Sequence, residues 1–173
     1  MPDQHREVID RFTGPYAFLS NFHPCRVTFY GMTFPSVEAA FQAAKCADHR
    51  DRAQFLAMTP KQAKRRGRQI RMRDDWDARK RTIMHNLLVH KFSENPDLIP
   101  KLLATGGAVL VEGNTWHDNY WGCCTCSRCS SCRFSSVENR SSSPFRAKFP
   151  LSIGIRQHLL CKRFVGFCHL ALG

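Results

Sequence analysis

The segment SVEAAFQAAKCAD, residues 36–48, constrains the fold of this chain more than any other stretch. Its apolar residues recur at the spacing i, i+3, i+4 and i+7, which predicts an amphipathic helix that packs on a core. Ser36 stands at the expected N-cap, because its hydroxyl can accept a hydrogen bond from a free N–H group of the first turn. The apolar positions are Val37, Ala40, Phe41 and Ala44.

The same helix carries three polar groups on another face. Glu38, Gln42 and Lys45 recur at i, i+4 and i+7, so a carboxylate, an amide and an amine project together. A solvated helix face is the ordinary interpretation of such a pattern. The alternative interpretation is a functional site. The other motifs of the chain help to decide between the two.

The composition is that of one globular domain. Of the 173 residues 43% are hydrophobic, including 13 Phe and 3 Trp, which is enough for a sizeable core. The sequence has no apolar run of 18 residues, and its first segment, MPDQHREVID, is polar. We therefore expect no membrane span, no secretory signal and a cytoplasmic location.

The net charge of +12 is unevenly distributed along the chain. Residues 1–122 hold 18 basic and 13 acidic residues, which leaves +5, and residues 123–173 hold 8 and 1, which leaves +7. Such a balance attracts polyanions in general without naming one. Seven of the nine cysteines also lie in residues 123–173, so the cysteine excess belongs to this tail.

Helices alternate with short strands in the predicted order of elements. Beyond the helix at 36–48, we expect helices at 49–58, 61–66, 74–95 and 97–104. Thr59 and Pro60 mark the start of the second of these, with Pro at the first helical position. We expect strands at 7–12, 25–30, 32–34 and 108–111, with Gly31 joining the middle pair.

Two aromatic-rich segments contain polar residues that need partners. Ser20 and Asn21 interrupt the aromatic segment 16–22, where they serve either a turn or a pocket, because an unpaired buried polar group costs about 1–3 kcal/mol. The loop at 112–122 sets two carboxylates and one His among two Trp and one Tyr. That makeup is typical of a stacking pocket with an acid–base group in it.

The densest basic run of the chain lies between residues 61 and 73. It is interpreted either as a solvated positive face or as a phosphate-binding surface, since Arg offers paired donors to phosphate. Its members are Lys61, Lys64, Arg65, Arg66, Arg68, Arg71 and Arg73.

Several short strings follow one another in a characteristic order. They are FLSNF (18–22), the strand pair ending at Pro35, VEAAFQAAK (37–45), TPKQAKRRGR (59–68), DW (75–76), KF (91–92), LLATGGAVLVEGN (102–114) and DNYWG (118–122). Together they resemble the NADAR domain, also called the YbiA-like family, over about residues 11–122. The resemblance implies an α+β fold, a mostly helical single domain with a small β-sheet, which would occupy residues 1–122.

The resemblance also implies an activity. Members of the family hydrolyse an N-glycosidic bond, either in early phosphorylated riboflavin intermediates or between ADP-ribose and guanine in nucleic acid. We therefore expect an ADP-ribose-like or phosphoribosyl small molecule, or ADP-ribosylated nucleic acid, as the partner. We expect no cofactor, no bound metal and no membrane partner, and the oligomeric state stays open.

Catalytic roles follow from the chemistry of the bond. Cleavage passes through an oxocarbenium-like state that a carboxylate stabilises, and the candidates are Glu38 and Asp118, with Glu112 third. A positioned acid protonates the leaving base, or a lysine attacks the anomeric carbon and forms an imine. Lys45 is the candidate lysine, and attack requires burial that lowers its pKa.

Substrate-binding roles complete the expected site. Tyr120 and Trp121 would stack on the base, and Ser20 and Asn21 would bind ribose hydroxyls. Trp76 would line the pocket or belong to the core. The full set of candidate binding residues is Ser20, Asn21, Phe22, Gln42, Trp76, Tyr120 and Trp121.

Residues 123–173 depart from the family, whose members usually close with a helix of the type G-x-N-x-LG-x-x-LM-x-x-R. Three explanations stay open: a diverged or disordered tail, a shifted reading frame near residue 123, and a metal-binding insertion. The cysteines at 124, 126, 129 and 132 suffice for zinc, but they lie closer together than the usual paired hooks. A disulfide framework does not suit a chain without a secretory signal.

Two further functions compete with hydrolysis. One is a non-catalytic module that binds ADP-ribose or nucleic acid through the basic run and the basic tail. The other is an inactive family member with a damaged C-terminus, because loss of a closing helix exposes apolar surface.

Overall fold

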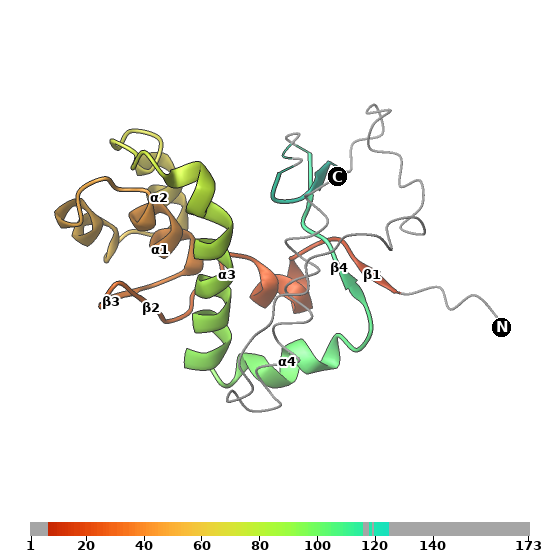
Figure 1. Ribbon diagram of the computed structural model, residues 1–173. Helices are drawn as coiled ribbons and strands as arrows, with labels where there is room; N and C mark the ends of the chain where they lie inside the picture. The colour runs from red at the N-terminus through yellow and green to blue at the C-terminus, as the bar shows by residue number, and fades with distance from the viewer. Residues whose placement is uncertain (1–6, 116–117, 119, 125–173) are drawn as a thin grey trace. The chain divides into compact units, whose positions relative to one another are not determined.

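The computed structural model describes residues 7–115, 118 and 120–124. They belong to two compact units, residues 1–109 and residues 110–173. Helices dominate the first unit (Figure 1). None of the helices in the described ranges is long and apolar enough to cross a membrane.

Helix α1 (Val37–Ala44) is the central element of the first unit. The hydroxyl of Ser36 accepts a hydrogen bond from the Ala39 N–H at 3.1 Å, which confirms the predicted N-cap. Helices α2 (Pro60–Arg66) and α3 (Trp76–Glu94) pack on it, as does the 3-10 helix η2 (Arg50–Phe55). Since neighbours surround α1, all eight of its residues are buried.

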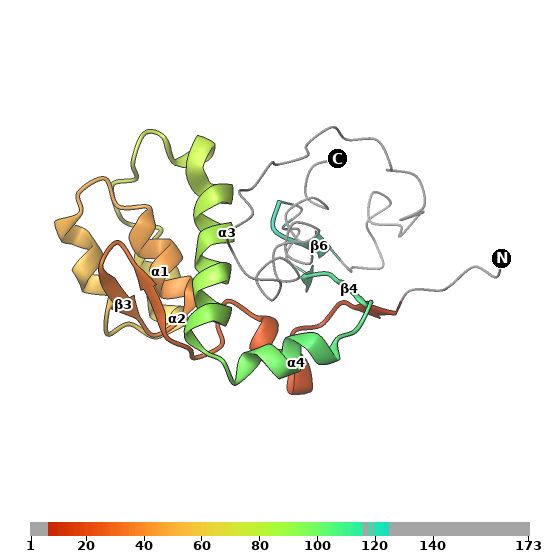
Figure 2. The ribbon, with the colours of Figure 1, turned by 60° about the horizontal axis from the view of Figure 1, so that its bottom comes forward.

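Strands β2 (Val27–Phe29) and β3 (Met32–Phe34) form an antiparallel hairpin that packs on α1 (Figure 2). The two residues between the strands, Tyr30 and Gly31, have φ angles of 51° and 73°. Positive φ at both positions is what a two-residue hairpin turn of type I′ requires, and glycine adopts it at little cost. The predicted strand pair around Gly31 is confirmed.

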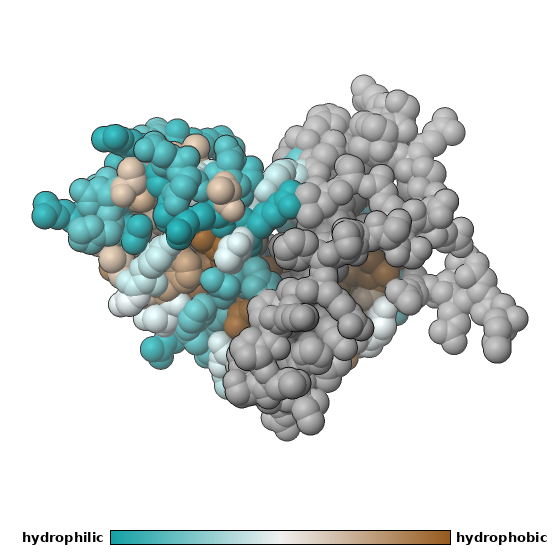
Figure 3. Space-filling model, in the orientation of Figure 1, coloured by the Kyte–Doolittle hydropathy of each residue, from teal (hydrophilic) through white to brown (hydrophobic). Residues whose placement is uncertain are grey.

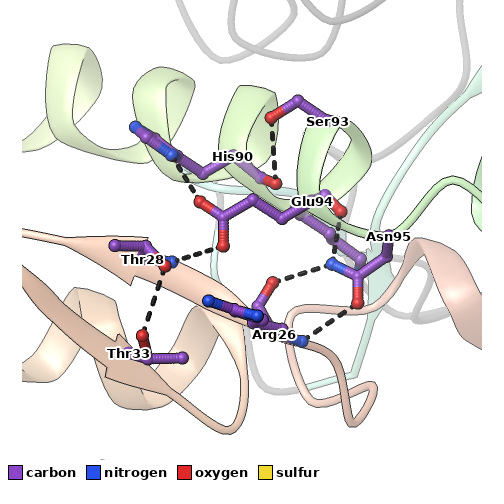
Figure 4. A network of polar contacts seen from close by, with 8 residues as sticks. Arg26, Thr28, Thr33, His90, Ser93, Glu94 and Asn95 are labelled. Carbon is purple, nitrogen blue, oxygen red and sulfur yellow. Dashed lines mark hydrogen bonds and ion pairs between the residues drawn. The ribbon is translucent and has the colours of Figure 1, made fainter.

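The C-terminal end of α3 holds this hairpin through polar contacts (Figure 4). The Glu94 carboxylate accepts the Thr28 N–H at 2.9 Å and contacts the ring of His90 at 2.8 Å. The Asn95 side chain accepts the Arg26 N–H at 3.1 Å and donates to the Arg26 carbonyl oxygen at 2.7 Å. These bonds give hydrogen-bond partners to backbone groups of Arg26 and Thr28 that do not pair with β3.

Helix α2 begins with the Thr59 hydroxyl accepting from the Gln62 N–H, while the Gln62 side chain accepts from the Thr59 N–H. This reciprocal capping confirms the predicted start at Pro60. The segment predicted as a helix at 49–58 is the shorter η2. Its bonds join residues three apart, as in Arg52 N–H to His49 O at 3.2 Å, a pattern confined to short pieces.

The other elements of the first unit are the 3-10 helix η1 (Gly14–Leu19), helix α4 (Leu98–Ala104) and strand β1 (Val8–Ile9). Strand β4 (Val109–Leu110) pairs with β1, and the Val109 N–H donates to the Glu7 carbonyl oxygen at 2.8 Å. In the second unit, β5 (Gly113–Asn114) pairs in parallel with β6 (Cys123–Cys124). The expected α+β, mostly helical class is confirmed, with the described strands in two-stranded pairings.

Candidate functional site

The polar face of α1 is buried, which makes it the candidate site of the first unit. Only 7% of Glu38 and 5% of Gln42 is exposed. The interpretation of this face as solvated is therefore wrong. The spacing of residues within one helix does not reveal that the segment at 20–22 and the end of α2 approach the polar side. The Asn21 carbonyl oxygen accepts the Glu38 N–H at 3.0 Å, and Gly67 lies against the Gln42 amide.

Glu38 and Gln42 are directly bonded. The Gln42 Nε2 donates to the Glu38 Oε1 at 2.9 Å. Burial raises the pKa of the Glu38 carboxyl above its ordinary value, while the Gln42 bond and the charges of Lys64 and Lys45 oppose that rise. Burial thus disfavours the charged form of the carboxyl, while Gln42, Lys64 and Lys45 favour it.

Lys45 follows the last turn of α1 and lies over two aromatic rings. Its Nζ is 5.5 Å from the ring centroid of Phe41 and 5.6 Å from that of Trp76, and these rings are 4.9 Å apart. Burial lowers the pKa of the Lys45 amine; the charge of Glu38 opposes this, and Lys64 and Arg68 add to it. A buried acid with a raised pKa and a half-buried amine with a lowered one, each acting on the charge of the other, are typical of a functional site.

Trp76 belongs to the core, which was one of the two roles predicted for it. It is 6% exposed and packs on Phe41, as a core residue does. Its ring also faces the Lys45 amine, where the aromatic quadrupole favours the charged form of the amine. Contact of Trp76 with a substrate stays a prediction.

The segment at 20–22 forms a turn beside α1. The Ser20 hydroxyl accepts the Phe22 N–H at 3.1 Å, and the Asn21 Nδ2 donates to the Met84 sulfur at 3.7 Å. These partners explain how two polar residues are tolerated in an aromatic-rich segment. Binding of ribose hydroxyls by Ser20 and Asn21 stays a prediction. The Phe22 ring is 40% exposed, and the Lys64 Nζ lies 5.5 Å from its centroid.

Sequence reasoning missed Lys91 as a part of this region. Its side chain is fully buried, and its Nζ donates to the Ser20 carbonyl oxygen at 2.8 Å. Burial lowers its pKa to about 8. One signal was present: Lys91 continues the i+4 series of Ile83 and Leu87, so a lysine occupies an apolar position of α3.

Most of the basic run between residues 61 and 73 is exposed, on a region of the surface where hydrophilic residues predominate (Figure 3). Arg73 and Lys64 are the exceptions, because both are half-buried. Arg73 pairs with Asp75 and donates to the Tyr30 hydroxyl at 3.3 Å. Lys64 differs from the rest because its charge acts on both Glu38 and Lys45. Exposure suits a solvated face and a phosphate-binding surface equally. The exposed members are Lys61, Arg65, Arg66, Arg68 and Arg71.

In the second unit Asp118 organises a turn. Its Oδ1 accepts the N–H groups of Tyr120 and Trp121 at 3.0 Å each. The Asn114 side chain accepts the Asp118 N–H at 3.0 Å and donates to the Asp118 carbonyl oxygen at 2.7 Å. The Tyr120 and Trp121 rings meet edge to face at 4.8 Å. The catalytic role of Asp118 and the stacking roles of these rings stay predictions, as does that of Glu112.

Within the described ranges no group of three or more His, Cys, Asp or Glu side chains is placed to hold a metal ion. The cysteines at 126, 129 and 132, with the rest of the tail after residue 124, lie outside the described residues. The predicted division of the chain at residue 122 stays a prediction.

The family model of the NADAR domain matches residues 9–140. N-glycosidase Npun_R5314 of Nostoc punctiforme is 36% identical over 115 residues, which are 63% of this chain and 73% of that protein. N-glycosidase YbiA of Escherichia coli is 36% identical over 110 residues, 62% of this chain and 68% of that protein. Riboflavin biosynthesis protein VVA0006 of Vibrio vulnificus is 36% identical over 110 residues, but the match spans only 30% of its length.

A solved structure resembles the fold as well. The NMR structure of E. coli YbiA gives a TM-score of 0.57 at 31% sequence identity. The match covers 70% of this chain and 80% of that one.

Proposed function

Because this chain belongs to the NADAR domain family, we propose that it hydrolyses an N-glycosidic bond to an ADP-ribosyl or phosphoribosyl group. The observation that carries the proposal is the buried Glu38 carboxyl together with the half-buried Lys45 amine, whose pKa values are shifted in opposite directions. Two of the relatives reported above bear N-glycosidase names, and a third is named for riboflavin biosynthesis. The substrates to test are early riboflavin-pathway intermediates and ADP-ribosylated guanine.

Lys45 acts as the nucleophile in this proposal. Its free amine attacks the anomeric carbon of the ribose, the bond to the base breaks, and the base leaves with the bonding electrons. The proton lost by the attacking nitrogen goes to the leaving base. The sugar ring then opens to an imine, and water adds to the imine carbon, which releases the sugar and restores the amine. The lowered pKa of Lys45 supports this role, because it raises the fraction of free amine at neutral pH.

Glu38 stabilises the charge that develops on the sugar and carries the proton from the amine to the base. A carboxylate beside an oxocarbenium-like centre lowers the barrier electrostatically. The raised pKa of Glu38 supports the proton transfer, because its carboxylate accepts a proton more readily than an ordinary carboxylate does.

The other site residues keep the roles that the resemblance implies. Asp118 is proposed as a second carboxylate, and Tyr120 and Trp121 as stacking residues for the base. Ser20 and Asn21 are proposed to bind ribose hydroxyls. Phe22, Gln42 and Trp76 are proposed to line the substrate site.

The test is a hydrolysis assay on the purified full chain with two substrates: DNA containing ADP-ribosylated guanine, and the phosphoribosylamino-pyrimidine of riboflavin synthesis. Release of the base from one of them establishes the activity and its substrate type. A folded protein that releases neither base contradicts the proposal.

A binding module is the second candidate, favoured by the exposed basic run between residues 61 and 73. It predicts saturable binding of ADP-ribose or nucleic acid without product, unchanged by Glu38→Gln. Binding through phosphate contacts would also weaken steeply with added salt. An inactive family member predicts neither product nor binding.

A further inference from the structure

Gly67 ends α2 in a conformation that does not require glycine. Its φ and ψ angles are −62° and −11°, in the right-handed helical region that every residue adopts. The usual reason for a glycine after a helix, a positive φ, is therefore absent. Space around the α-carbon is the remaining reason.

That space is occupied by the Gln42 side chain. A Cβ atom on residue 67 would lie 1.9 Å from the Gln42 Oε1 and 2.6 Å from its Cδ. The Gln42 residue is 5% exposed, and its Oε1 is buried without a hydrogen-bond partner among the residues that the structure describes. The amide is thus held against the backbone of Gly67 by close packing.

The other end of the same amide determines its orientation. The Gln42 Nε2 donates to the Glu38 Oε1 at 2.9 Å. An ionised carboxylate only accepts hydrogen bonds, so it selects the amide orientation with Nε2 toward Glu38 and Oε1 toward Gly67. The Nε2 end of the Gln42 amide is therefore hydrogen-bonded to Glu38, and the Oε1 end packs against Gly67.

We propose that Gly67 is a positioning residue of the site: its missing side chain leaves the room in which Gln42 holds the Glu38 carboxylate. This role rests on the proposed function of Glu38. Gly67 itself acts only through Gln42.

The test is Gly67→Ala alone and combined with Gln42→Ala, with Gly107→Ala as the matched control. A Cβ atom added at the control position would have no heavy atom within 4 Å, so the extra methyl group meets open space there. We expect Gly67→Ala to lower kcat at least tenfold and Gly107→Ala to leave it unchanged. In the Gln42→Ala background, Gly67→Ala should have no further effect, because the atoms it collides with are gone.

A readout that does not depend on turnover is the pKa of the Glu38 carboxyl, measured by NMR titration of its carboxyl carbon. The Gln42 bond lowers this pKa, so Gly67→Ala should raise it, and Gln42→Ala should raise it by a similar amount. If the titration shows this and no substrate is hydrolysed, the positioning role stands and the proposed function fails.

Other outcomes overturn the inference. A Glu38 pKa unchanged in Gly67→Ala would show that the glycine does not act through Gln42. Equal losses caused by Gly67→Ala with and without Gln42 would show the same. If Gly67→Ala alone does not fold, folding restored by Gln42→Ala supports the role, and failure of both variants to fold contradicts it.

Discussion

The side-chain amine of Lys91 donates a hydrogen bond to the backbone carbonyl oxygen of Ser20 at 2.8 Å, within a fully buried environment. The carbonyl oxygen of the next residue, Asn21, accepts the Glu38 N–H at 3.0 Å. Lys91 therefore fixes, from α3, the turn against which the first turn of α1 rests. A lysine that is buried for this purpose costs folding free energy whenever it is charged.

We predict that deprotonation of Lys91 raises the free energy of unfolding between about pH 8 and pH 10.5. Burial lowers the pKa of Lys91 from 10.5 to about 8 in the folded chain. Within that window the unfolded chain holds a proton that the folded chain lacks, so stability rises with pH, by about 3 kcal/mol in all. Urea titrations of the natural chain and of Lys91→Met at several pH values measure this. The free energy of unfolding of the natural chain minus that of Lys91→Met should rise with pH across this window. A value of this difference that does not change with pH would contradict the prediction.

The rate of hydrolysis should rise with pH. The Glu38 carboxyl must lose its proton, with a pKa above its ordinary value, and the Lys45 amine must lose one too, with a pKa below its ordinary value. Profiles of kcat/KM against pH report both events in the free enzyme. A rate that instead falls above neutral pH would assign Lys45 to proton donation and rule out its attack on the sugar.

Reduction with borohydride during turnover should attach the sugar to Lys45. The proposed imine is reduced to a stable amine, which mass spectrometry of a proteolytic digest locates. Lys45→Ala should abolish the adduct, whereas Lys61→Ala, an exposed lysine of α2, should leave it unchanged. An adduct of equal yield in Lys45→Ala would place the nucleophile elsewhere.

Asn95→Ala should destabilise the first unit by about 0.5–1.5 kcal/mol, the net worth of a typical hydrogen bond, because the exposed Arg26 N–H and carbonyl oxygen lose their partner. The urea midpoint measures the change. Ser93→Ala is a suitable control, since Ser93 is exposed and its hydrogen bond, to the His90 carbonyl oxygen at 3.2 Å, is local. Equal midpoints for both variants would show that the contacts in Figure 4 do not stabilise the hairpin.

Local sequence signals predict the elements of the first unit well. The Ser36 cap, the Thr59–Pro60 helix start and the hairpin around Gly31 each depend on residues close in sequence, and the structure confirms them. Length is less well predicted: the strand expected at 25–30 is limited to Val27–Phe29, because its partner β3 has only three residues.

Local sequence signals do not predict that the candidate site is buried. Glu38 and Gln42 have the spacing of a solvated face, and what buries them comes from segments near residues 21 and 67. Those approaches depend on tertiary packing, which periodicity within one helix does not encode. The spacing singled out Glu38 and Gln42 as members of one face, and the resemblance to a family favoured a functional role for Glu38.

The most direct test of the account compares initial rates of base release by the natural chain and by Glu38→Gln, on both substrate types. Asp77→Asn is the matched control, because it makes the same carboxylate-to-amide change on an exposed side chain. We predict release by the natural chain and by Asp77→Asn at equal rates, and a loss of about 100-fold or more in Glu38→Gln, the size typical of removing one charge-stabilising group. Equal rates for the natural chain and Glu38→Gln would contradict the account, as would a folded natural chain that releases no base.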